Sequence, residues 1–394
     1  MSSSDSRPCF LAYGDRGPVL YSVNFVDEKT YKKRKFCRRC CIDIHDGDEE
    51  SKDGKAELDE GGLRLLSPLK SKKSSWFPSC SIVVALGSVV YALGGMIKCP
   101  NKKFEVIYSR ECFYFDTNRP KGGWIRGPHM LNGRDGGKAA AVEGKIYVFG
   151  GVDLDYAPEP WAEVFDPINK KWEALPRPPD ELEDCIVLQA ATYGGPLEEK
   201  KIMVGGSFKY VYHLNSSSWE YLRNIHLNNC HENIIGAGNF MYWTDMGYLC
   251  VVNMESGSYY GGEIKGYRIG KYRDRYECEP TLLHLGGKKF CLLTLHDVRG
   301  GRWGDRCKIW CAKFEVSKLI DGLKNIEDNL IASIVCRDTY IVDQSLGCWH
   351  GHWHGLVLDG MLDGIKNVEE SVSKEVVEEV TIDNASGDMV AIDM

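Results

Sequence analysis

The sequence feature that most constrains the fold is an apolar run that ends in two adjacent glycines and recurs three times at a nearly fixed period. The pairs close the segments Gly87–Gly95, Gly144–Gly151 and Lys200–Gly206, the last being a weaker copy. They lie 56 and then 55 residues apart. An apolar run that ends in two glycines predicts a buried strand followed by a tight turn, because glycine tolerates the backbone angles of such turns. Recurrence at a nearly fixed period predicts a repeat architecture.

Each copy continues with a second apolar segment that precedes a tryptophan, and the tryptophans are 48 and 47 residues apart. The pairs are Phe113–Asp116 with Trp124, Glu163–Asp166 with Trp172, and Val211–Leu214 with Trp219. We interpret the second segment as a strand that ends in a turn, and the tryptophan as the start of an outer strand that covers the space between neighbouring units. Because one such sheet cannot bury both of its faces, the copies must stack around an axis.

This pattern resembles the kelch family, whose repeats are about 50 residues long. The matching positions are Val89–Gly95, Phe115 and Trp124 in one copy, and Ile146–Gly151, Phe165 and Trp172 in the next. The resemblance implies an all-β fold, a kelch-type β-propeller made of four-stranded blades. The chain looks most like plant kelch-repeat proteins, many of which carry an F-box for ubiquitin ligase assembly.

The remaining blades are degenerate in sequence. Cys230–Asp245 and Tyr248–Asn253 predict the first three strands of a fifth blade, and Thr281–His296 begins a sixth. Closing a propeller needs strands from both chain ends in one blade, so Phe10–Phe36 and an inner strand from Trp349–Leu358 are expected to pair. We predict six blades over residues 8–360, with seven blades as the alternative.

Four segments are predicted to lie outside the blade pattern. Residues 1–7 and the acidic loop 43–62 are expected to be disordered and solvated, respectively. Leucine and isoleucine at helical spacing predict a short helix near 317–330. The tail, residues 361–394, holds nine acidic residues against two lysines and is expected to be disordered.

Composition narrows the classes of function. The chain of 394 residues is 43% hydrophobic and 27% charged, as in soluble globular proteins. Its net charge of −7 argues against nucleic acid as the main ligand. No apolar window reaches the length of a membrane span and the first residues lack a signal-peptide core. The 16 cysteines are scattered through strand-like runs, which indicates reduced thiols and a cytoplasmic or nuclear protein.

A candidate binding site follows from the blade alignment. The strands nearest the axis all begin at one mouth of the central channel, so polar residues at these starts converge there although they are far apart in sequence. They are Arg134, Asp135, Asp184, His231, Glu232, Glu279, His352 and His354. A concave place with convergent polar groups is the usual ligand site, although any solvated rim is also polar.

A metal site was the competing hypothesis for the segment around His350, His352 and His354, where three histidines recur at spacing two. Such histidines bind zinc or iron in other folds when a further ligand is available. The intervening tryptophans and glycines instead favour close packing between blades. Cys37 and Cys40 have the spacing of a zinc pair, but the matching second pair is missing. We therefore predict no metal, no cofactor and no catalytic residue.

Two functional hypotheses remain. The first is a monomeric interaction module that binds a partner protein or peptide through its loop face, with a substrate-adaptor role in ubiquitination as one version; neither nucleic acid nor membrane is expected as a partner. No F-box is recognisable, since Phe10–Phe36 reads as strands of the first blade. The alternative is a small-molecule binder or metal-assisted enzyme at the channel mouth. Plant nitrile-specifier kelch proteins use iron held by a Glu-x3-Asp-x3-His motif, which is absent here, so the balance favours a protein without enzymatic activity.

Overall fold

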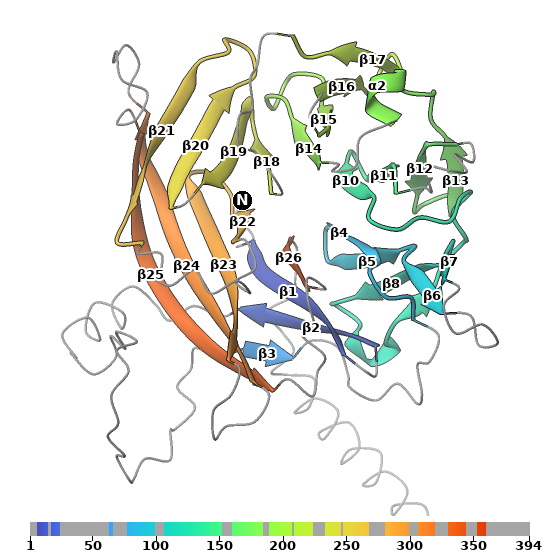
Figure 1. Ribbon diagram of the computed structural model, residues 1–394, viewed down its shortest axis with the longest axis horizontal. Helices are drawn as coiled ribbons and strands as arrows, with labels where there is room; N and C mark the ends of the chain where they lie inside the picture. Colours follow the sequence, from blue (N-terminus) through green and yellow to red (C-terminus); the bar gives the residue numbers. More distant parts are fainter. Residues whose placement is uncertain are drawn as a thin grey trace, which may run out of the picture.

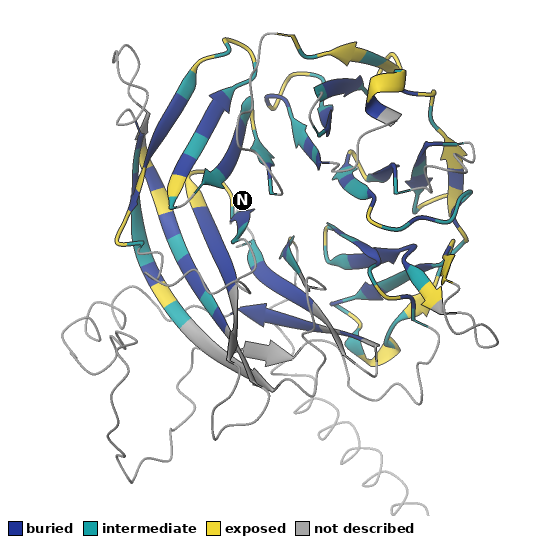
Figure 2. Ribbon diagram, viewed as in Figure 1, coloured by how far each residue is buried: buried dark blue, intermediate teal, exposed yellow. Residues whose placement is uncertain are grey.

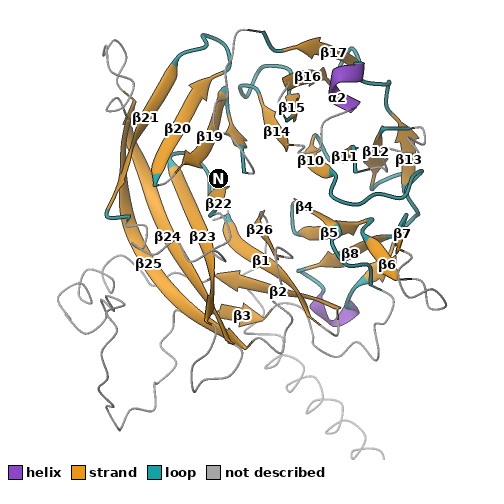
Figure 3. Ribbon diagram, in the orientation of Figure 1, coloured by secondary structure: helices purple, strands orange, loops and turns teal. Residues whose placement is uncertain are grey.

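The computed structural model describes most of the residues between Ser6 and Asp359. The described ranges are 6–14, 17–23, 63–65, 77–98, 106–151, 160–183, 189–206, 209–223, 233–245, 247–267, 280–298, 306–319, 330–343 and 353–359. Nearly all of the regular structure in these ranges is strand, as Figure 3 shows. The helical elements among them are η1 (Pro120–Gly122) and α2 (Asp180–Glu183). The predicted all-β class is confirmed.

Three consecutive sheets contain the repeats that were visible in the sequence, and each has four antiparallel strands in chain order. The first comprises β4 (Ile82–Leu86), β5 (Val89–Leu93), β8 (Cys112–Asp116) and β9 (Ile125–Arg126). The second comprises β10 (Lys138–Val142), β11 (Lys145–Phe149), β12 (Ala162–Asp166) and β13 (Lys171–Ala174). The third comprises β14 (Gln189–Tyr193), β15 (Lys201–Gly205), β16 (Lys209–His213) and β17 (Ser218–Tyr221).

The second strand of each repeat is its most buried part. In β11, Ile146, Tyr147, Val148 and Phe149 are all buried, which explains why this run is apolar on both sides of the strand. It follows β10 through a two-residue turn in which Glu143 and Gly144 both have positive φ, the geometry of the tight hairpins that suit twisted strands. The apolar run therefore lies where the sequence predicted a buried strand.

A further eight-stranded sheet consists of two four-stranded units joined edge to edge. One unit holds β18 (Ile235–Ala237), β19 (Phe240–Asp245), β20 (Tyr248–Asn253) and β21 (Tyr259–Lys265). The other holds β22 (Thr281–His284), β23 (Lys289–Val298), β24 (Arg306–Leu319) and β25 (Leu330–Asp343). The outer strands β21 and β25 are joined in parallel, with Ile264 opposite Ala332.

Both ends of the described chain meet in one sheet, whose strand order is β26-β1-β2-β3. Its strands are β1 (Arg7–Gly14), β2 (Gly17–Val23), β3 (Leu63–Leu65) and β26 (Trp353–Leu358). Strand β26 pairs antiparallel with β1, with Leu356 opposite Cys9. The predicted closure by a C-terminal inner strand is confirmed. The outermost strand, β3, comes from farther along the chain than predicted, and residues 24–36 lie outside the described ranges.

The sheets are arranged around a central axis, as Figure 1 shows. The first strand of each four-stranded unit contacts the first strand of the next: β26 with β4, β4 with β10, β10 with β14, β14 with β18, and β18 with β22. Strand β22 then contacts β26, so the ring of inner strands closes. This is the propeller-like arrangement that the repeat predicted.

Hydrophobic residues fill the space between neighbouring sheets, and the repeat tryptophans contribute to it. Trp172 packs in one cluster with Ile82 and Leu93 of the preceding sheet. Its indole nitrogen donates a hydrogen bond of 3.0 Å to the carbonyl oxygen of Pro128, and the indole of Trp219 donates one of 3.1 Å to Pro176. The predicted role of the tryptophans as covers between units is confirmed for these two positions.

The predictions for segments outside the blades have mixed outcomes. The ends of the helix predicted near 317–330 are wrong, because residues 317–319 belong to β24 and Leu330 begins β25. These strands pair up to Leu319 opposite Leu330, so cross-strand pairing overrides the helical spacing there. Ser6 and Arg7 are ordered: the Ser6 hydroxyl donates to Asp359 at 2.6 Å and Arg7 begins β1. The other predicted loop, helix and tail residues (1–5, 43–62, 320–329 and 361–394) lie outside the described ranges.

Candidate functional site

The candidate site is the side of the ring at which the inner strands β4 and β10 begin, which we call the loop face. On this side the second strand of each repeat ends at its glycine pair and the chain enters the next sheet. Three described segments form it near the first two repeats: Phe77–Ser81, Pro128–Gly137, and a hairpin of β6 (Met96–Lys98) and β7 (Val106–Tyr108). Ser79 and Met96 form a backbone bridge that joins the first segment to the hairpin.

The glycine pairs are needed because the following segment passes directly against them. The backbone nitrogen of Gly95 donates to the carbonyl oxygen of Arg134 at 2.7 Å, and a Cβ on Gly94 would lie 2.5 Å from that same oxygen. In the next repeat, the backbone nitrogen of Asp135 donates to the carbonyl oxygen of Gly151 at 2.6 Å. The Gly-Gly signature therefore marks the points where one sheet is attached to the loop that starts the next.

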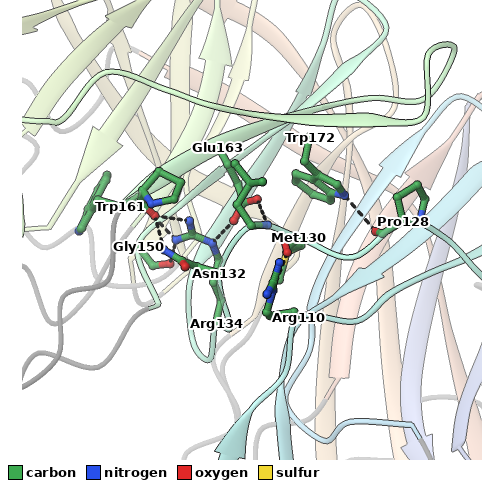
Figure 4. Close-up of polar contacts among 11 residues, drawn as sticks. Arg110, Pro128, Met130, Asn132, Arg134, Gly150, Trp161, Glu163 and Trp172 are labelled. Atoms are coloured by element: carbon green, nitrogen blue, oxygen red, sulfur yellow. Dashed lines mark hydrogen bonds and ion pairs between the residues drawn. The ribbon is translucent and has the colours of Figure 1, made fainter.

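Arg134 is the centre of a buried polar network (Figure 4). Its Nε donates to Glu163 Oε1 at 2.7 Å, and its two terminal nitrogens donate to the carbonyl oxygens of Gly150, Trp161 and Pro160 at 2.6 to 2.8 Å. The second carboxylate oxygen of Glu163 accepts from the backbone nitrogen of Leu131 at 2.7 Å. The guanidinium thus holds the loop 131–134 against the segment that enters β12.

Both charges of this ion pair have 0% exposed side chains. Burial lowers the pKa of Arg134, and the charge and hydrogen bond of Glu163 oppose that shift. The cost of removing two charges from water is offset here because the guanidinium donates to one carboxylate oxygen and to three carbonyl oxygens. The structure therefore differs from the predicted rim position of Arg134: it holds the loop from inside and cannot touch a partner directly.

Asp135, the neighbour of Arg134, is half-buried and lies close to Cys80 at the start of the preceding inner strand. Burial raises the pKa of the Cys80 thiol, the negative charge of Asp135 raises it further, and a hydrogen bond with Ser79 lowers it. Two strand starts that are 55 residues apart in sequence are therefore brought together at the loop face.

His354 lies in β26 opposite Leu11 and is half-buried. It shares a face of the strand with Leu356 and Leu358, which pack toward the first repeat sheet with Val90 and Phe115. On the other face, a Cβ on Gly355 would lie 2.7 Å from Thr281 Cγ2 of β22. The predicted role of Gly355 in close packing between blades is confirmed, and His354 belongs to the strand that closes the ring.

The other predicted site residues lie outside the described ranges, so their convergence stays a prediction. They are Asp184, His231, Glu232, Glu279 and His352. Within the described part of the chain, no group of three or more histidine, cysteine, aspartate or glutamate side chains is placed to hold a metal ion. None of the helices described there has the length and apolar character needed to cross a membrane.

The β6–β7 hairpin is a surface that the sequence did not suggest. Ile97, Val106, Ile107 and Tyr108 are 37%, 43%, 52% and 39% exposed. Figure 1 places the hairpin at the outer side of the first repeat sheet, and Figure 2 shows exposed residues there. The short apolar runs on either side of residues 99–105 were visible in the sequence, but such runs are equally typical of a buried strand. Only the tertiary structure shows that no described segment covers them.

The closed ring of four-stranded sheets, with its Gly-Gly turns and inter-sheet tryptophans, defines a β-propeller. The family model described as "FKB95, Kelch-repeats domain" matches residues 46–322. Because this is more than half of the chain, the protein belongs to the kelch-repeat family.

Curated relatives from Arabidopsis thaliana agree with this assignment. F-box/kelch-repeat protein At4g19330 is 28% identical over 245 residues, which are 60% of this chain and 55% of that protein. F-box/kelch-repeat protein At4g19870 is 29% identical over 270 residues, or 66% of this chain and 62% of that protein. Kelch repeat-containing protein At1g19470 is 26% identical over 62% of this chain and 57% of its own length. The chain thus spans less than two thirds of these relatives.

Proposed function

We propose that this kelch propeller is an interaction module that binds a partner protein through its loop face. The observation that carries this proposal is an exposed apolar hairpin on a rigid base. The backbone nitrogen of Ser109 donates to the carbonyl oxygen of Gly95 at 2.7 Å, and the backbone nitrogen of Arg134 donates to the carbonyl oxygen of Ser109 at 3.1 Å. The base of the β6–β7 hairpin is therefore attached to the loop 131–134 that Arg134 holds. Contiguous exposed apolar residues on a pre-formed surface are typical of protein-binding sites.

Six blades are the proposed count for this propeller. The support is the closed ring of inner strands β26, β4, β10, β14, β18 and β22, each of which starts a four-stranded unit. A seventh blade would have to insert between two of these neighbours, and each neighbouring pair is already in contact.

A substrate-adaptor role in ubiquitination is the finer version of the proposal. It is supported by the names of two similar proteins, which are F-box/kelch-repeat proteins. In this version the propeller selects the protein to be modified, and the connection to the ligase comes from an F-box or from a bridging protein. A ligase component should then be recovered together with the partner.

The test is quantitative affinity capture with the full chain from a cell extract. Tyr108→Ala removes a loop-face side chain that is 39% exposed, and Tyr221→Ala removes a matched tyrosine, 42% exposed, on the outer strand β17. We expect enrichment of the partner to fall several-fold for the first variant, since aromatic residues often dominate interfaces, and to persist for the second. No protein enriched over an unrelated bait, or an equal loss in both variants, would contradict the proposal.

A further inference from the structure

Charge is distributed unevenly along this chain. The tail, residues 361–394, contains nine acidic residues and two lysines, and its net charge of −7 equals that of the whole chain. The remaining 360 residues therefore carry 47 charges of each sign. Valines and other apolar residues alternate with the acids, as in Val376-Val377-Glu378-Glu379-Val380. A segment of this composition would match a surface that is both apolar and basic.

The β6–β7 hairpin provides such a surface. Its four exposed apolar residues are close in sequence to the exposed side chain of Arg110. The segment that forms the first repeat sheet and its connections, residues 77–137, has eight basic residues against four acidic ones. In the described part of the chain, β7 pairs as a strand with β6 alone.

The tail also begins beside the sheet that carries the hairpin. The backbone nitrogen of Asp359 donates to the carbonyl oxygen of Gly87 at 3.2 Å. Gly87 is in the turn between β4 and β5, and β5 leads directly to the hairpin at Met96. This path of nine residues covers at most about 30 Å, whereas 34 tail residues reach roughly 110 Å when fully extended. The tail is therefore long enough to reach the hairpin.

Attachment to the same chain makes even a weak contact effective. A segment tethered by a short linker has an effective concentration on the order of millimolar. Burial of Ile107 and its neighbours stabilises the contact by the hydrophobic effect, and carboxylates beside Arg110 add attraction that salt screens. We propose that the β6–β7 hairpin is the docking surface for the chain's own acidic tail, residues 361–394. This inference goes beyond the proposed function, because it assigns the hairpin an occupant from the chain itself, which would compete with a partner protein for the same surface.

Hydrogen exchange of the full-length protein, followed by mass spectrometry, tests this inference. We expect tail amides to exchange on the order of tenfold more slowly than in a synthetic peptide of the same sequence, and to lose this protection in high salt. Ile107→Asp should abolish the protection. Ile168→Asp is the matched control, because Ile168 is an isoleucine 88% exposed in the turn between β12 and β13, and it should leave the protection unchanged.

A second variant distinguishes loss of tail docking from a folding defect in the hairpin. Reversing three tail charges (Glu375→Lys, Glu378→Lys and Glu379→Lys) leaves the propeller sequence intact and should increase exchange in β6 and β7. The inference would be overturned if tail amides of the wild-type protein exchanged as fast as those of the free peptide. It would also be overturned if their protection survived Ile107→Asp, or if Ile168→Asp reduced the protection as much as Ile107→Asp does. Protection that depends on protein concentration would also overturn it, because the occupant would then be a second copy. None of these readouts requires a partner, so failure here is distinguishable from failure of the proposed function.

Discussion

At the scale of single residues, the most consequential side chain is a buried arginine that works from inside the loop face. Arg134 and Glu163 are both fully buried, so the energy of this pair depends on keeping both members. A lone charge left in this place would have no compensating partner. The rim that is expected to meet a partner is therefore held by residues that a partner never touches.

Removing one member of the pair should be costly. We predict that Glu163→Ala lowers the free energy of unfolding by about 3–5 kcal/mol, because it leaves a guanidinium buried without its counter-charge. The double variant with Arg134→Met and Glu163→Leu should lose less unfolding free energy than either single substitution alone, because it leaves no buried charge unpaired. Chemical denaturation measures both. Glu173→Ala is the control, since Glu173 pairs with Lys171 at 2.8 Å in an exposed position, and it should leave the unfolding midpoint unchanged. A loss as large in the control would contradict this account.

The thiol of Cys80 should report the charge of Asp135. Its pKa is raised by burial first and by Asp135 second, so little thiolate is present near pH 8 and the rate of alkylation should rise with pH through a midpoint above that of an ordinary thiol. Asp135→Asn removes the second cause, lowers the pKa and should speed alkylation at pH 8.5, measured by peptide mapping. Cys112, whose pKa is raised to about 12 mainly by burial, should not change. A slower reaction of Cys80 in the variant would show that Asp135 does not act electrostatically.

At the scale of elements, the glycine pairs attach one sheet to the loop of the next. Two glycines of the second repeat separate the effects of backbone angle and of space. Gly144 and Gly151 both have positive φ, at 76° and 70°. A Cβ on Gly144 would meet nothing within 4 Å, whereas one on Gly151 would lie 2.4 Å from the backbone nitrogen of Gly137.

This contrast predicts that a glycine-to-alanine substitution lowers the free energy of unfolding by different amounts at the two positions. Gly144→Ala should cost about 1 kcal/mol, because only the backbone angle is unfavourable for alanine. Gly151→Ala should cost more than about 2 kcal/mol, because the loop 135–137 must also move away. Thermal or chemical unfolding of the two variants measures the difference. Equal costs would indicate that the loop yields freely and that close approach is not the reason for the second glycine.

At the scale of the whole molecule, closure depends on strands from opposite ends of the described chain. Gly355→Val should loosen this closure, since its side chain would enter the space of Thr281 and Leu283. We expect faster hydrogen exchange in β26 and also in β1, although their sequences are far apart. Gly287→Ala is a control for backbone strain without crowding, since Gly287 has a positive φ of 56° and a Cβ there meets nothing within 4 Å. Faster exchange confined to β26 would mean that β1 does not depend on the closing strand.

Features of the fold that depend on residues close together in sequence could be predicted, whereas features that depend on contacts between distant segments could not. The spacing of Gly95, Gly151 and Gly206 and of the tryptophans predicted the strands and the repeat, because these depend on apolar runs and on turns that glycine permits. The closure is an exception, because it followed from the need of a propeller for strands from both chain ends. The helix near 317–330 was wrong at its ends because β24 and β25 pair with each other over their whole length. Local spacing cannot reveal a pairing partner.

The same distinction separates the fold from the site. By itself, the sequence determined an all-β repeat protein of the kelch family type, with an acidic tail, because period, composition and glycine positions are properties of the chain alone. Only the tertiary structure decided that Arg134 is buried while Ile107 is exposed. Burial depends on which distant segments cover a side chain: Arg134 is enclosed by Pro160–Glu163 from the next repeat, and no described segment covers Ile107.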